Sequence, residues 1–350
     1  MSEEQEQSNS DKMNKRFYSQ TNNKEGTETK TTNTIDIKNA KSLKDFNYYY
    51  NDKGQLRSID KEEKFQFVDQ DHYDRMGDFI VREIQDKMMN DPYQLDEVWI
   101  PKKEDDNDNE PIAQSNIFLS KDFYENTDRL MIIICGSGAV RAGQWARSLC
   151  INNELDTGSI LPYLDKAQKL GFSLIVLNPN FTSSVPTSND KQENGLKKKK
   201  RNERELIKGS ETPFNHVLYC WDNFIKHSPA KEIAIVAHSF GGEVTRHLLD
   251  KRTEELRQKI KVIAFTDSVH GGGRGGDSSF SSSFFKKNAI NWVTSREPLN
   301  TDLGFSNSQS CQRRSAGHNV HEFTSGFCIN PLFEYVKLKL KLQDKEHSSI

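Results

Sequence analysis

The sequence predicts an α/β fold in which a mostly parallel sheet is flanked by helices. From residue 130 onward, apolar runs that suit buried strands alternate with amphipathic stretches that suit helices. This alternation is typical of a parallel sheet with helices on both faces. The runs 130–135, 172–177 and 233–237 each end in a turn-forming segment. In such sheets, functional groups lie beyond the carboxyl ends of the strands.

The first ordered elements are expected shortly after a polar N-terminal segment. Residues 1–43 are rich in Ser, Thr, Asn, Lys and Glu, so we expect a disordered tail. A hairpin is predicted over 46–59, with Gly54 in its turn. Apolar residues at four-residue steps predict an amphipathic helix over 72–90.

The remaining elements alternate along the chain. Strands are predicted at 97–100, 117–120, 130–135, 172–177, 233–237, 262–265 and 291–294. Helices are predicted at 144–149, 159–170, 213–227, 243–249 and 332–343. A polar, basic insertion at 181–212 and a tail at 344–350 are expected to be disordered. Residues 44–343 are therefore predicted to form one domain, with six to eight strands in its sheet.

Composition limits the classes of function. Lys and Arg number 49 against 51 Asp and Glu, so neither direct nucleic-acid binding nor membrane binding is expected. No apolar run approaches the roughly 18 residues of a membrane helix. The N-terminus is unlike a signal peptide. A soluble protein of the nucleus and cytoplasm is the expectation.

Cysteine and basic clusters add little further chemistry. The five cysteines show no C-x-x-C spacing, which indicates buried, reduced thiols in an intracellular protein and no zinc site. No metal or other cofactor is predicted. The basic run 197–201 suits either a nuclear-localisation signal or a solvated loop. The glycine-rich segment 271–276 lacks the following Lys-Ser/Thr pair of a phosphate-binding loop.

The strongest chemical motif surrounds Ser239. The apolar run 233–237 passes into a helical stretch through Ala-His-Ser-Phe-Gly, a small-x-Ser-x-Gly turn between strand and helix. This is the nucleophile elbow of α/β-hydrolases, where the strained turn requires small neighbours such as Ala237 and Gly241. The alternative interpretation is a serine that caps the helix after it.

A serine nucleophile needs a histidine base and a carboxylate that orients the base. The order along the chain in this fold is serine, acid, histidine. Glu297 follows the second strand beyond the elbow, the usual position of the acid, and Asp267 at the end of the next strand is the alternative. His321 is the predicted base, with His318 in the same loop as the alternative.

Two backbone N–H groups should stabilise the oxyanion of such a site. One is expected from Phe240, the residue after the nucleophile. The other is expected from the glycine-containing loop after strand 130–135, at Ser137 and Gly138, because glycine lets the backbone approach closely. His270 lies in a segment resembling a lipase loop in which the histidine mainly holds the loop.

Several long segments resemble one known family in the same order. They are FNYYYNDKGQLR (46–57), GSGAVRAGQWARSLCINNELDTGS (136–159), LIVLNPN (174–180), YCWDNFI (219–225), VAHSFGG (236–242), FTDSVH (265–270), NWVTSREPL (291–299) and RRSAGHNVHEFTS (313–325). Together they resemble the Argonaute-binding-protein (Arb-two) domain family over roughly residues 44–340, and its animal-type cotranscriptional regulators in particular. One difference is the insertion, which carries one basic cluster where animal members carry several.

The resemblance implies an α/β-hydrolase-like fold and a nuclear role at chromatin, with Argonaute or chromatin-associated partners, in gene silencing or RNA processing. It places the nucleophile at Ser239 and the base at His321. Two hypotheses follow. One is a regulatory scaffold with a hydrolase fold, and the other is an active serine hydrolase acting on an ester, amide or acyl substrate.

The predicted organisation can be tested by limited proteolysis. We expect a protease to remove residues 1 to about 42 and to cut within 181–212, because polar segments that bury little apolar surface are cut first. Mass spectrometry of the fragments would locate the cuts. Early cuts within 230–270 would contradict the assignment of a single domain.

Overall fold

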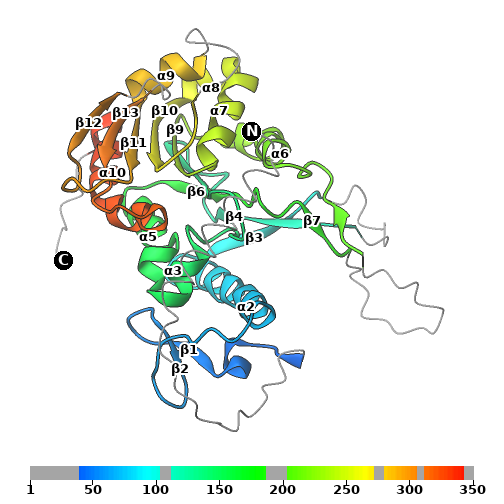
Figure 1. The fold of residues 1–350 in the computed structure, drawn as a ribbon. Coiled ribbons are helices and arrows are strands. Elements are labelled where there is room, and N and C mark those ends of the chain that lie inside the picture. The colour runs from blue at the N-terminus through cyan, green and yellow to red at the C-terminus, as the bar shows by residue number, and fades with distance from the viewer. Residues whose placement is uncertain (1–38, 103–111, 187–202, 272–279, 306–310, 343–350) are drawn as a thin grey trace, which may run out of the picture.

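The structure, a computed structural model, describes residues 39–102, 112–186, 203–271, 280–305 and 311–342. Its centre is a nine-stranded sheet in the order β12-β13-β11-β10-β9-β5-β6-β4-β3 (Figure 1). The strands are β3 (Leu95–Ile100), β4 (Ser115–Ser120), β5 (Arg129–Ile134), β6 (Ser173–Val176), β9 (Glu232–His238), β10 (Ile260–Thr266), β11 (Ala289–Val293), β12 (Asp302–Phe305) and β13 (Gln312–Ser315).

Six adjacent strands of this sheet, from β13 to β6, are parallel. The strands at the two edges are antiparallel to their neighbours. The prediction of a mostly parallel sheet flanked by helices is confirmed. The described sheet has one strand more than the largest number predicted, because the short, half-exposed strands β12 and β13 lack long apolar runs.

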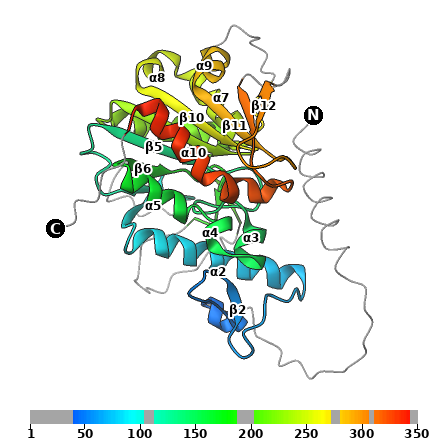
Figure 2. The ribbon, with the colours of Figure 1, turned by 90° about the vertical axis from the view of Figure 1, so that its left-hand side faces the viewer.

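Helices cover both faces of the sheet (Figures 1 and 2). One layer contains α2 (Gln70–Met89), α3 (Arg147–Asn152), α4 (Leu155–Gly158), α5 (Leu161–Lys169) and α10 (Thr324–Leu340). The other contains α6 (Pro213–Asn223), α7 (Gly241–Lys251), α8 (Thr253–Lys259) and α9 (Phe280–Asn288). Within β9, Val236 packs into the first layer and Ile235 into the second, as expected for a strand buried on both sides.

The N-terminal elements follow the sequence prediction. The strands β1 (Tyr48–Tyr50) and β2 (Leu56–Ser58) form an antiparallel hairpin, with Gly54 in its turn at φ 66°. Asp69 caps α2 by accepting a hydrogen bond from the His72 backbone N–H. The prediction of a helix over 72–90 is confirmed within two residues at each end.

The closing helix differs from the prediction. It was expected to begin at Leu332, directly after Pro331, but α10 begins at Thr324 and continues through Pro331. Proline lacks the N–H group that would bond to the carbonyl four residues earlier, which here belongs to Phe327. The Phe327 side chain is 44% exposed, so this turn of the helix borders solvent.

Both ends of the segment 181–212 belong to the fold. Strand β7 (Ser183–Ser184) pairs with β8 (Glu205–Leu206) in a short antiparallel ribbon, and Ile207 is fully buried. The predicted disordered insertion, 181–212, therefore included ordered residues at both of its ends. The stretch 187–202, including the basic run 197–201, lies outside the described residues, as do residues 1–38 of the predicted N-terminal tail and the predicted tail 344–350. The N-terminal tail was predicted to extend to residue 43, but Leu43 is buried in the 3₁₀ turn Leu43–Phe46, so the order begins earlier than predicted.

The five cysteines are buried, as predicted, and the structure has them as free thiols. Burial raises the pKa of the thiols of Cys135, Cys150 and Cys311 to about 12. None of the helices in the described part of the chain is long and apolar enough to cross a bilayer.

The packing of α7 against β5 gives a test of the fold. A Cβ atom at Gly241 would lie 2.8 Å from the Cys135 carbonyl oxygen and 2.9 Å from that of Ile134. Because these are backbone atoms of a central strand and its end, Gly241→Ala should lower the free energy of unfolding by about 1–3 kcal/mol. Urea denaturation would measure the change.

Gly77→Ala is the matched control. The three atoms nearest to its Cβ would all belong to the guanidinium end of the Arg147 side chain, at 2.9–3.1 Å, and a side-chain end can move more easily than backbone. Alanine also favours the interior of α2 over glycine by about 0.5–1 kcal/mol. If Gly241→Ala cost no more than Gly77→Ala, the close contact between α7 and β5 would be wrong.

Candidate functional site

Ser239 occupies a strained turn between β9 and α7. Its backbone has φ 52°, a left-handed conformation that residues other than glycine seldom adopt. The Ser239 N–H donates to the Thr266 carbonyl oxygen at 3.1 Å, and the Ser239 carbonyl oxygen accepts from the Val269 N–H at 3.1 Å. These bonds tie the turn to the end of β10. The strand–serine–helix turn predicted from the sequence is present.

Small residues are required around this turn. A Cβ atom at Gly136 would lie 2.8 Å from Ser239 Cβ, and one at Gly242 would lie 1.7 Å from Ser268 Oγ. The backbone of the loop after β5 therefore packs directly against Ser239. Ala237, two residues before the serine, is fully buried.

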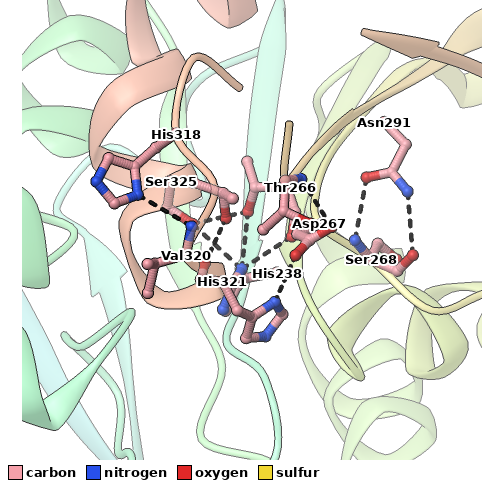
Figure 3. Close-up of polar contacts among 11 residues, drawn as sticks. His238, Thr266, Asp267, Ser268, Asn291, His318, Val320, His321 and Ser325 are labelled. Carbon is pink, nitrogen blue, oxygen red and sulfur yellow. Dashed lines mark hydrogen bonds and ion pairs between the residues drawn. The ribbon is translucent and has the colours of Figure 1, made fainter. Parts of the chain in front are cut away.

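His321 and Asp267 form a hydrogen-bonded pair beside this turn (Figure 3). His321 Nδ1 lies 2.7 Å from Asp267 Oδ2. His321 belongs to the 3₁₀ turn His321–Phe323, and Asp267 directly follows β10 with φ 43°. The other Asp267 oxygen accepts from the Thr294 backbone N–H at 3.1 Å. The carboxylate is thus held from two sides, toward the imidazole and toward the end of β11.

The pair stabilises its own charged forms. Burial alone raises the pKa of Asp267, but the hydrogen bond and charge of His321 outweigh it, so the pKa of Asp267 is lowered. Burial likewise acts to lower the pKa of His321, but the hydrogen bond and charge of Asp267 raise it overall. The Asp267 side chain is 17% exposed and that of His321 is 42% exposed. The imidazole is therefore accessible to a ligand while its carboxylate partner is shielded.

A second histidine, His238, packs against the ring of His321. His238 precedes Ser239, is buried, and its ring centroid lies 4.6 Å from that of His321 at an interplanar angle of 31°. Its Nδ1 lies 2.8 Å from the Thr266 carbonyl oxygen; since a carbonyl only accepts, Nδ1 carries the proton. Burial, with a further contribution from His321, lowers the pKa of His238 to about 3. It is therefore a neutral, fixed surface beside the His321 ring.

The structure corrects the predicted acid. Glu297 is exposed, and the hydrogen bonds described for it are made by its backbone N–H and carbonyl groups. The carboxylate that bonds to His321 belongs to Asp267, the alternative. The physical reason is position along the strands: Asp267 leaves β10 at once, whereas Glu297 lies four residues beyond the end of β11.

The alternative base, His318, makes its contacts with residues other than Asp267. His318 Nδ1 accepts the Val320 backbone N–H at 3.1 Å, and the ring stacks on Phe323 with centroids 4.3 Å apart. Of the two candidate bases, His321 is the one beside Asp267. Within the described residues, no hydrogen bond joins the Ser239 hydroxyl to either imidazole.

The candidate oxyanion groups border Ser239. Phe240 is the N-cap of α7, and the first N–H groups of a helix have no acceptor inside it. Ser137 and Gly138 are exposed in the loop after β5, and Gly138 has φ 108°. Through Gly136 this loop contacts Ser239, so the expected groups lie in the two segments that adjoin the nucleophile position.

Two asparagines that hold this loop were missed by sequence reasoning. Asn180 Nδ2 donates to the Gly136 carbonyl oxygen at 2.6 Å and to that of Val140 at 3.3 Å. Asn178 Oδ1 accepts the Ala142 N–H at 3.0 Å. Both residues follow β6, so the rule that functional groups lie beyond the carboxyl ends of strands could have found them.

The asparagines continue a buried polar network. Asn178 Nδ2 donates to Asn116 Oδ1 at 2.7 Å, and Asn116 Nδ2 donates to Gln85 Oε1 at 3.2 Å. Gln85 Nε2 returns to the loop by donating to the Ala142 carbonyl oxygen at 3.1 Å. Helix α2 and strand β4 therefore fix the loop through side chains far away in the sequence.

His270 has a structural environment, as its sequence context suggested. It is buried, its Nδ1 lies 3.0 Å from Ser268 Oγ, and its Nε2 lies 3.2 Å from Cys311 Sγ. Its ring stacks on Phe265 at 4.2 Å. Among the residues that the structure describes, no group of three or more His, Cys, Asp or Glu side chains is placed to hold a metal ion.

The fold and the turn at Ser239 together define an α/β-hydrolase-like protein. A family model described as Arb2 domain matches residues 40–299. The chain belongs to the Arb2 domain family, as the sequence resemblance predicted.

Similar proteins cover most of the chain. It is 51% identical over 321 residues to a Dictyostelium discoideum protein named cotranscriptional regulator ARB2A homolog, covering 87% of this chain and 81% of that protein. It is 34% identical over 336 residues to the Homo sapiens cotranscriptional regulator ARB2A, covering 84% and 79%. A solved structure of a histone deacetylase from Saccharomyces cerevisiae resembles it with a TM-score of 0.45 and 12% identity, covering 77% and 99%.

The Asp267–His321 pair can be tested without any assay of activity. Because Asp267 stabilises the imidazolium, NMR titration should give His321 a pKa above that of an ordinary histidine. Asp267→Asn should lower this pKa by at least about one pH unit, since it removes the neighbouring charge. Glu297→Gln, an equivalent change at an exposed carboxylate, should leave it unchanged. The opposite pattern would restore Glu297 as the partner.

Proposed function

We propose that this chain is a regulatory protein whose α/β-hydrolase fold carries a serine-hydrolase site formed by Ser239, His321 and Asp267. The observation that carries the chemical part is the geometry at one end of the sheet. There, a serine in a left-handed turn directly follows His238, whose ring centroid lies 4.6 Å from that of His321, and His321 Nδ1 is 2.7 Å from a shielded carboxylate. This arrangement supplies the nucleophile, the base and the orienting group that acyl hydrolysis needs.

The role of each group follows from its hydrogen bonds. The Asp267 carboxylate only accepts, so His321 Nδ1 carries a proton and Nε2 is left with its lone pair. In the proposed reaction, Nε2 takes the proton of Ser239 as Oγ attacks the acyl carbonyl carbon. The same proton then passes to the leaving alcohol or amine, and water releases the acyl group by the reverse roles.

The oxyanion would be stabilised by backbone N–H groups. Phe240 at the start of α7 and the loop containing Ser137 and Gly138 both adjoin Ser239, and donors fixed in advance need no reorganisation as charge develops. Asn180 contributes indirectly, because its bonds to the Gly136 and Val140 carbonyl oxygens hold the loop on both sides of Ser137 and Gly138.

The regulatory part of the proposal rests on the relatives. Proteins named cotranscriptional regulators match this chain over more than four fifths of its length, which supports a role in gene regulation and a nuclear location, with a cytoplasmic pool as the composition suggested. The partners we propose are proteins, Argonaute or chromatin-associated, as the family resemblance implies, in silencing or cotranscriptional RNA processing.

A scaffold that uses the fold without catalysis is the second candidate. The observation that favours it is the lack, among the described residues, of a hydrogen bond between the Ser239 hydroxyl and an imidazole. Such bonds are often long until substrate is bound, so this geometry is compatible with either function, and reactivity separates them.

The decisive experiment is labelling with a fluorophosphonate, which reacts with an activated serine. We expect the full-length protein to be labelled and Ser239→Ala to abolish the signal. His321→Ala should slow labelling by at least about a hundredfold, because the base acts with the nucleophile as a unit. Asp267→Asn should slow it by a similar factor, whereas Glu297→Gln should not.

The pH profile gives a second readout of the same experiment. The base must be neutral to accept a proton, so labelling should fall as the pH drops through the pKa of His321. Since Asp267 raises that pKa, the fall should occur at higher pH than for an ordinary histidine, and at lower pH in Asp267→Asn. No labelling, with partner binding intact in Ser239→Ala, would instead support the scaffold. Labelling that survives Ser239→Ala would exclude Ser239 as the nucleophile.

A further inference from the structure

Two arginines and a phenylalanine form a cluster next to the loop that borders Ser239. The guanidinium carbon of Arg141 lies 5.4 Å from the centroid of the Phe181 ring, and that of Arg204 lies 5.9 Å from it. Arg141 lies within the loop after β5, Phe181 follows β6, and Arg204 precedes β8. Three separate segments thus bring two cations to one aromatic ring.

This cluster lies close to the nucleophile position. Asn180, adjacent to Phe181, donates from one amide to the carbonyl oxygens of both Gly136 and Val140. The carbonyl groups of Gly136 and Val140 therefore meet at this amide. Gly136 contacts Ser239, and Arg141 directly follows Val140. Arg141 therefore belongs to the same loop, and directly follows a carbonyl group that Asn180 holds together with that of Gly136.

The positive charge of the cluster is not neutralised within the described structure. Arg141 Nη1 donates to the Val140 carbonyl oxygen at 3.0 Å, and Arg204 bonds to Ser183. No carboxylate among the described residues pairs with either guanidinium. The neighbouring Arg147, in contrast, pairs with Asp74 at 3.2 Å and Asp78 at 3.8 Å.

Arg141 is also partly withdrawn from water. Burial, and next the charge of Arg147, lower the pKa of Arg141, and they outweigh the opposing contribution of the Asp78 charge. A guanidinium presents its N–H groups in a planar fork that matches a carboxylate. The Arg141 guanidinium is half-buried and has no carboxylate partner among the described residues. It is therefore suited to bind an anionic group of the substrate.

We propose that Arg141, Arg204 and Phe181 form a subsite for the carboxylate end of an acyl group, so that the site at Ser239 takes half-esters of short dicarboxylic acids. This inference rests on the proposed hydrolase function. The ester C–O bond breaks, the serine receives the acyl group, the alcohol leaves with the proton, and water then releases the dicarboxylate. Phe181 provides an apolar face for the methylene groups between the two ends.

Hydrolysis of paired esters tests the subsite. The probes are 4-nitrophenyl hydrogen glutarate and its neutral counterpart 4-nitrophenyl butyrate, with kcat/KM measured for each. The wild-type protein should prefer the acidic ester. Arg141→Gln and Arg204→Gln should each reduce the ratio of acidic to neutral kcat/KM, by about tenfold or more for Arg141, while the value for the neutral ester changes little. Arg141→Lys should restore part of the preference.

Arg257→Gln is the matched control, because it also removes a guanidinium that lies over a phenylalanine ring, 5.1 Å from the centroid of Phe280, but on α8. It should leave the ratio unchanged. Thermal melting of each variant verifies folding. Since Arg204 is exposed, its variant remains informative even if a change at Arg141 unfolds the chain.

A binding measurement separates this inference from the proposed function. In Ser239→Ala, calorimetry should show tighter binding of the acidic ester than of the neutral one, and Arg141→Gln in that background should remove the difference. If the wild type hydrolyses neither ester but this binding pattern holds, the hydrolase proposal fails and the anion subsite stands. The subsite proposal is overturned if the protein hydrolyses or binds the two esters without preference for the acidic one. It is also overturned if the preference is unchanged in both arginine variants.

Discussion

The parallel pairing of β9 with β10 is the constraint on which the site depends. Its register sets His238 opposite Thr266, so the next residues, Ser239 and Asp267, leave the sheet at the same level. Both adopt left-handed backbone conformations there, which turn the chain sharply out of the strands. The bond from the Ser239 N–H to the Thr266 carbonyl oxygen continues the ladder by one step. A shift of register would separate the serine from the carboxylate that serves its histidine.

Local features of the site were readable from the sequence, and long-range ones were not. The turn at Ser239 is encoded by adjacent residues, a buried strand, small neighbours and a helix, so the motif sufficed. The choice between Asp267 and Glu297 depends on how far each lies beyond the end of its strand. It also depends on where the loop that carries His321, about fifty residues after Asp267, meets the sheet. Both acids follow strands of the sheet, and only the three-dimensional arrangement brings one of them to His321.

The same distinction explains the fold. The central strands are continuous apolar runs buried on both faces, which is why they were predicted in order. Strands β12 and β13, at one end of the sheet, and the ribbon of β7 and β8 are short and half-exposed or exposed. Their pairing rather than their composition defines them. Helix α10 was shortened in the prediction because Pro331 resembles a helix start. The network linking Gln85, Asn116 and Asn178 could not be anticipated, since no local pattern joins them.

The burial of all five cysteines has a practical consequence for studying this protein. Buried thiols held well above their ordinary pKa contain almost no thiolate at neutral pH, and thiolate is the form that reacts with maleimides and similar reagents. The native cysteines should therefore react very slowly with thiol-directed dyes and spin labels. A single cysteine placed at the exposed Asn319, two residues before His321, or on the exposed strand β8, would carry the responsive probe. Distances between such probes could then follow the site in solution without first removing any native cysteine.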